Sequence, residues 1–124
     1  MKIRIKGDHL RFRLRQHDVA MLCNMGSIVE RIEFGETADQ QISFSLESYD
    51  EDKISITYEN NFVKVFIPRK SIDQWANTDQ VEIEAAADTG KNKRISVLIE
   101  KDLACLDASE EDNIGTYPNP LANC

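Results

Sequence analysis

Residues 2–14 read KIRIKGDHLRFRL, and this stretch decides how the fold begins. Apolar and basic side chains alternate on both sides of Gly7-Asp8, which is typical of two strands that each bury one face. A glycine followed by a polar residue suits a tight type II′ turn. With that turn Ile5 lies opposite Leu10, so the apolar faces of the two strands match. We therefore predict an antiparallel hairpin with one apolar and one basic face.

The same reasoning extends along the chain. A second hairpin is predicted over residues 53–67, where Asn60-Asn61 supplies the positive φ angles of a tight turn. Alternating apolar residues predict further strands, which cover residues 28–34, 42–47, 80–86 and 93–101. Short helices are predicted over residues 16–25, ending at Gly26, and over residues 70–77, beginning with a Ser71–Gln74 capping box.

These elements predict the α+β class. Tight turns between successive strands favour antiparallel pairing. We expect a mainly antiparallel sheet of about six or seven strands, with the two short helices packed on one face. No internal repeat is evident in the sequence.

The composition is that of one globular domain. The chain has 124 residues, of which 41% are apolar and 30% are charged, and single domains commonly have about 100–150 residues. We expect the globular domain to cover residues 1–106. Residues 107–124 are expected to form an acidic, proline-containing tail, because the alternating pattern stops there and the prolines exclude regular structure.

Nothing in the sequence indicates export or a membrane partner. Met1 leads directly into the first strand without an apolar signal segment, and no apolar run approaches the roughly 18 residues of a membrane span. Cys23, Cys105 and Cys124 form no CxxC pair, which favours reduced thiols in the cytoplasm. His9 and His17 form no close pair with them either, so we expect no metal and no cofactor.

Charge is distributed unevenly. The net charge is −7, yet residues 1–15 hold six basic side chains and only one acidic one. The overall acidity disfavours nucleic acid as a partner. In the predicted hairpin Arg4 lies opposite Arg11 and Lys2 opposite Arg13, and like charges opposed across strands repel each other. These four residues, which we call the basic stripe, therefore need negative counter-charges.

Three interpretations of the basic stripe are open. Acidic residues on an adjacent strand, or the acidic tail, would neutralise it internally; the candidates on strands are Glu30, Glu33, Glu82 and Glu84. Alternatively the stripe binds an anionic small molecule or an acidic protein segment, for which arginine offers bidentate contacts. In the third interpretation the charges are simply solvated. Our leading functional hypothesis is the second, a non-enzymatic binding domain.

Two other functions compete with this hypothesis. Glu82, Glu84 and Glu100 are alternating acids that, together with the basic stripe, would suit a metal-assisted phosphate hydrolase. We lean against an enzyme, because no catalytic or phosphate-binding motif is present. A structural role is the other alternative, in which Phe62 and Phe66 or an exposed strand edge drives formation of a homodimer.

Several motifs together resemble a known family. They are the opening MKIRIKG with LRFRL, the segment IPRKSIDQWANTDQVEIE, and the ending LIEKDLACL followed by acidic residues and YPNP. The EKDxxCL and YPNP landmarks are similar to those of a family of small uncharacterised bacterial proteins. The resemblance implies a bacterial, cytosolic domain of unknown function, and it transfers no catalytic residue.

Overall fold

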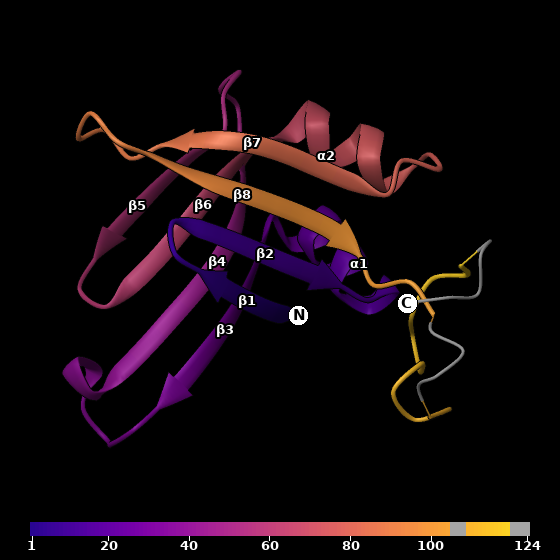
Figure 1. The fold of residues 1–124 in the computed structure, drawn as a ribbon, viewed down its shortest axis with the longest axis horizontal. Coiled ribbons are helices and arrows are strands. Elements are labelled where there is room, and N and C mark those ends of the chain that lie inside the picture. Colours follow the sequence, from indigo (N-terminus) through magenta and orange to yellow (C-terminus); the bar gives the residue numbers. More distant parts are fainter. Residues whose placement is uncertain (105–108, 120–124) are drawn as a thin grey trace.

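The computed structural model describes residues 1–104 and 109–119. Figure 1 shows its strands and helices along the chain. The elements are β1 (Lys2–Lys6), β2 (His9–Leu14), α1 (Gln16–Met25), β3 (Ser27–Glu33), a short 3₁₀ helix (Ala38–Gln40), β4 (Gln41–Tyr49), β5 (Ser55–Glu59), β6 (Phe62–Pro68), α2 (Arg69–Ala76), β7 (Glu82–Asp88) and β8 (Arg94–Lys101). None of the helices in the described ranges has the length and apolar composition to cross a membrane.

The eight strands form one mixed sheet in the order β1-β2-β8-β7-β5-β6-β4-β3. The α+β class and the two short helices are confirmed. The expectation of a mainly antiparallel sheet of about six or seven strands needs correction, because β2 runs parallel to β8 and β4 runs parallel to β6. Alternation within a strand does not reveal which distant strand it joins, so these parallel contacts left no local signal.

The two predicted hairpins have the predicted registers. In the first, Ile5 pairs with Leu10 and Arg4 with Arg11, and Gly7 alone has a positive φ, of 56°. In the second, both Asn60 and Asn61 have positive φ angles, as a type I′ turn requires. Turn chemistry therefore sets both registers locally.

The helices begin and end for different reasons. α1 occupies the predicted residues, and Gly26 ends it in the left-handed conformation with φ of 81°. At its start the backbone N–H of Arg15 donates to Asp18 Oδ2 at 3.0 Å. α2 begins after Pro68, whose side chain makes no capping bond, so the predicted Ser71–Gln74 capping box is not what starts it. A proline is preorganised to begin a helix without one.

The chain contains a structural repeat that the sequence pattern did not reveal. The units β1-β2-α1-β3-β4 and β5-β6-α2-β7-β8 have the same order of elements. The second strand of each unit pairs in parallel with the fourth strand of the other unit. The two four-stranded groups that result, β1-β2-β8-β7 and β5-β6-β4-β3, meet at only one residue pair, Ser55 with Asp88.

Equivalent positions in the two units fill the core. Leu22 of α1 and Trp75 of α2 occupy matching places, and both are fully buried. The indole N–H of Trp75 donates to the carbonyl of Val81 at 2.8 Å, which ties α2 to the chain entering β7. The two helices contact each other and the inner face of the curled sheet near the end of β2 (Figure 1). Figure 1 shows both α1 and α2 away from the opposite end of this face.

Truncation in α1 tests this assignment of the core. We expect Leu22→Ala to lower the free energy of unfolding by about 2–5 kcal/mol, since it leaves a cavity between the helices and the sheet. The control is Met21→Ala on the same helix, where the side chain is 38% exposed and a change within about 0.5 kcal/mol is expected. Denaturant titration measures both. Equal losses in the two variants would contradict the packing described.

Candidate functional site

The basic stripe lies on the outer face of the β1-β2-β8-β7 group, the face turned away from the core. Strand register arranges this face in rows across the four strands. One row holds Lys2, Arg13, Glu100 and Glu82, and the next holds Arg4, Arg11, Leu98 and Glu84. The structure therefore brings the four predicted cations together as two adjacent pairs and places acidic residues beyond them.

Glu100 supplies the counter-charge at the centre of the stripe. Its Oε1 accepts from Arg11 Nε at 2.7 Å and from Arg13 Nε at 2.6 Å, while Oε2 accepts from Arg11 Nη2 at 3.3 Å. The glutamate is only 8% exposed, and in such surroundings charge-assisted hydrogen bonds offset the loss of water. One carboxylate is thus shared by two guanidinium groups.

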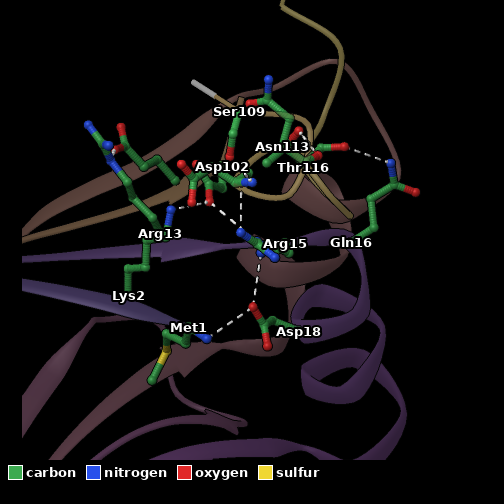
Figure 2. Close-up of polar contacts among 12 residues, drawn as sticks. Met1, Lys2, Arg13, Arg15, Gln16, Asp18, Asp102, Ser109, Asn113 and Thr116 are labelled. Carbon is green, nitrogen blue, oxygen red and sulfur yellow. Dashed lines mark hydrogen bonds and ion pairs between the residues drawn. The ribbon is translucent and has the colours of Figure 1, made fainter. Parts of the chain in front are cut away.

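Asp102 supplies a second counter-charge beside the first. This residue is 6% exposed, and its Oδ2 lies 3.2 Å from Lys2 Nζ and 3.8 Å from Arg15 Nε. Figure 2 shows Arg15 between Asp102 and Asp18, with the Met1 ammonium on the far side of Asp18 at 3.1 Å. Arg15 therefore contacts Asp102 through its guanidinium and Asp18 through its backbone N–H, which connects the segment after β8 to the first residue of the chain.

The expected internal neutralisation is present, although its acids differ from those expected. Glu30 instead binds the Met1 ammonium at 3.0 Å. Glu82 and Glu84 are exposed on β7, one strand further from the arginines than Glu100. The neutralising acids lie at the end of β8 because β2 pairs in parallel with that strand, and the sequence pattern gave no signal for this pairing.

Lys101 lies between the two acids and is also buried. Its Nζ donates to the carbonyl of Thr78 at 2.8 Å and stands 5.3 Å from the centre of the Tyr117 ring. Burial raises the pKa of Tyr117, and charge on Cys23 and Asp18 adds to this rise. Residues 100–102 thus hold β2, the turn after α2 and the segment around Tyr117 together.

The described part of the expected tail returns to the domain. The backbone N–H of Tyr117 donates to the Asp102 carbonyl at 2.7 Å, and that of Gln16 donates to the Gly115 carbonyl at 3.0 Å. Arg15 Nη2 donates to the Asp112 carbonyl at 2.8 Å. Arg15 is thus bonded to a backbone carbonyl of this segment, while the other bonds named here join backbone to backbone.

Two cations of the outer face have no internal partner. Within residues 1–104 and 109–119, the side chains of Arg4 and Lys6 make neither an ion pair nor a hydrogen bond, and both are exposed. They border an open pocket of about 780 Å³, which Arg11, His9 and Glu84 also line. Arg11 reaches this pocket from the row it shares with Arg4. The two unpaired cations of the face therefore lie together at the pocket, where the exposed carboxylate of Glu84 also stands.

The residues of the competing hypotheses are placed as follows. Glu82 lies directly opposite Glu100, and Glu84 opposite Leu98. Among the described residues, no group of three or more His, Cys, Asp or Glu side chains is arranged to hold a metal ion. Phe62 and Phe66 are half-buried on β6. The Nζ atom of Lys64 lies 4.9 Å from the centre of the Phe62 ring. The ring centres of Tyr49 and Phe66 are 5.5 Å apart.

The cysteines offer little to this face. Cys23 is half-buried on α1, and burial is the main cause of its raised pKa, with the nearby Asp73 adding to it. A raised pKa leaves less of the reactive thiolate at neutral pH. Cys105 and Cys124 lie outside the described residues.

These features define a class of protein, a small α+β domain whose curled sheet is assembled from two exchanged ββαββ units. The chain belongs to a family of unknown function, DUF7009, whose model matches residues 1–121. This confirms the expectation of an uncharacterised domain of unknown function. No curated protein and no solved structure matches the chain. The family has no assigned activity to transfer, so functional inference rests on the geometry of this chain.

Replacing Glu100 tests its role as the shared counter-charge. We expect Glu100→Gln to lower the free energy of unfolding by about 1–3 kcal/mol, because two neighbouring guanidinium groups lose their common partner. This loss of free energy is at the lower end of the range for breaking a buried ion pair, because the side chains of Arg11 and Arg13 are 32% and 42% exposed. Urea unfolding at low and high salt measures the loss.

The matched control for Glu100→Gln is Glu82→Gln on the neighbouring strand. Glu82 is exposed and faces another carboxylate, so its replacement is expected to leave stability within about 0.5 kcal/mol of the wild type or to raise it slightly. If Glu100→Gln proves as harmless as Glu82→Gln, the shared carboxylate is not needed to hold the stripe together.

Proposed function

We propose that this domain is a non-enzymatic binding protein for a small anion, which it holds on the basic stripe. Arg4 and Arg11 would make the direct contacts, with Lys2 and Arg13 contributing positive charge from the adjacent row. One observation carries the proposal. The two buried carboxylates Glu100 and Asp102 engage Lys2, Arg11 and Arg13, while Arg4 keeps all its donors for a ligand beside the open pocket.

The donors favour a ligand with at least two acidic oxygens. Arg4 offers five N–H groups in a planar fork, and Arg11 uses only Nε and Nη2 for Glu100. Lys6 and His9 stand on the same face at the pocket. Planar forks suit the paired oxygens of phosphate or carboxylate groups. A phosphate compound or a dicarboxylate therefore fits better than a monovalent anion.

The pocket supports a small molecule over an acidic protein segment. About 780 Å³ of open space lies within the range typical of small-ligand sites. An acidic protein segment offers the same oxygens and is the second possible source of this chemistry.

We also infer a cytoplasmic location for the domain. Its three cysteines form no CxxC pair in the sequence, which favours reduced thiols, and reduced thiols are usual in the cytoplasm.

Thermal unfolding with added anions tests the proposal. Inorganic pyrophosphate and succinate, at low salt, are expected to raise the Tm in proportion to the logarithm of their concentration. We expect Arg4→Gln to weaken the binding of pyrophosphate about ten-fold or more, because a charged hydrogen-bond donor is lost. The control is Arg69→Gln, an exposed arginine on α2, which is expected to bind like the wild type.

Each outcome of this experiment is informative. A short poly-glutamate peptide tested in parallel separates the two sources: a Tm shift with the peptide alone identifies an acidic segment as the partner. If Arg4→Gln raises the Tm and none of the anions shifts the Tm of the wild-type protein, the stripe is a structural feature whose repulsion is only relieved by mutation.

A further inference from the structure

The inner face of the sheet holds an apolar cleft that no part of the proposed function uses. Its lining includes residues of the β1–β2 turn and of the β5–β6 hairpin, and its volume is about 620 Å³. Figure 1 shows both hairpin turns away from α1 and α2. The apolar lining of the cleft comes from six strands and consists of Ile5, Leu10, Ile42, Phe44, Ile56, Tyr58, Val63 and Ile95.

The two structural units contribute equivalent residues to this cleft. Ile5 and Tyr58 hold the same place in β1 and β5, and Leu10 and Val63 the same place in β2 and β6. Ile42 of β4 likewise corresponds to Ile95 of β8. The cleft is therefore a product of the way the two units face each other, and its apolar surface is continuous across them.

The cleft exposes more apolar surface than core packing explains. Ile5 and Tyr58 are each 62% exposed and Ile42 is 38% exposed, while Leu10, Phe44 and Val63 line the cleft half-buried. Contiguous apolar patches of this kind on soluble proteins commonly mark binding sites. A concave apolar surface with a few polar groups at its edge is the usual form of a small-molecule site.

The charged groups at the rim set the polarity of the occupant. Asp8, Lys91 and Lys93 are the charged residues of the lining, and Lys93 Nζ lies 3.1 Å from Asp8 Oδ2. Within the described residues, Lys91 has no ion pair for its ammonium group, so the rim carries an excess positive charge. The rest of the lining is mostly apolar, with Thr57, Thr89 and Tyr58 as its other polar residues. A ligand with one anionic end and an apolar body matches this distribution.

We infer that the cleft binds an amphiphilic carboxylate, such as a medium-chain fatty acid. Its chain lies across Leu10, Phe44 and Val63, and its carboxylate meets the ammonium of Lys91. This site is separate from the basic stripe, because the side chains of Leu10 and Arg11 point to opposite faces of β2. Among the described residues, Gly7, Asp8 and Leu10 border both pockets, at the turn of the first hairpin and just after it.

Amide NMR of the full chain with sodium decanoate, below its micelle concentration, tests the inference. Chemical-shift changes are expected on β1, β4, β6 and the β7–β8 loop. Affinity is expected to increase about four-fold for each methylene added between hexanoate and decanoate, as apolar burial predicts. Decyltrimethylammonium, which has the same chain and the opposite head charge, is expected to bind more weakly.

Variants at exposed positions distinguish the contacts made by the alkyl chain of the ligand from the contact made by its carboxylate. Ile42→Asn is expected to weaken decanoate binding about ten-fold, because it removes apolar contact surface from the cleft. Lys91→Gln is expected to weaken decanoate binding about two- to five-fold, as an exposed ion pair would, without weakening that of decyltrimethylammonium. The controls are Val29→Asn and Lys70→Gln, whose side chains are exposed and lie outside the cleft lining.

Several results would overturn the inference. They are the absence of shift changes along the cleft, equal binding of the two head groups, and unchanged decanoate binding in Ile42→Asn. Sedimentation showing a dimer that Ile42→Asn dissociates would assign the cleft to a second copy of the chain. Pyrophosphate titration of the same samples reports on Arg4 and Arg11, so failure here is distinguished from failure of the proposed function.

Discussion

The carboxylate of Glu100, held between the guanidinium groups of Arg11 and Arg13, is the interaction on which the arrangement of this molecule depends. It neutralises charges that the first hairpin places side by side, and it does so from a strand near the other end of the sequence. A buried carboxylate is favourable only where cations and hydrogen-bond donors surround it. The pairing of β2 with β8 is therefore reinforced by charge as well as by backbone hydrogen bonds.

The same segment shows how charge and packing reinforce each other. Glu100, Lys101 and Asp102 are consecutive, alternate in sign and are all buried. Because successive side chains of a strand point to opposite faces, Glu100 faces the outer side while Lys101 faces the turn after α2. β2, the turn after α2 and the segment around Tyr117 thus all contact this one short segment. A change of strand register there would break these contacts together.

Local features of the sequence predicted local features of the structure. Gly7-Asp8 and Asn60-Asn61 set the two hairpin registers, and Gly26 marked the end of α1. The four cations of the basic stripe were predicted as opposed pairs, and the structure has those pairs. Whether they bind a ligand stays a prediction. The helix predicted over residues 70–77 lies within one residue of α2, but the capping box predicted at its start was wrong, because Pro68 holds the N-cap position.

What could not be predicted depends on distant contacts. The parallel pairings and the choice of Glu100 and Asp102 as counter-charges arise from chain segments that are far apart in sequence. The repeat was missed for a different reason. Matching core positions such as Leu22 and Trp75 share only their apolar character, so side-chain identity conceals the correspondence. The apolar cleft follows from that correspondence and was equally invisible in the sequence.

The exchange of strands between the two ββαββ units has a consequence for the way such a sheet is assembled. Neither unit completes its own group of four strands, since each contributes its third and fourth strands to the group of the other. A chain holding one unit would reach the same architecture by pairing with a second copy through reciprocal strand swapping. The present chain is in effect that swapped dimer joined by a covalent linker. Because each group of four strands combines strands from both halves, long-range closure, and not hairpin formation, is expected to limit how fast the chain folds.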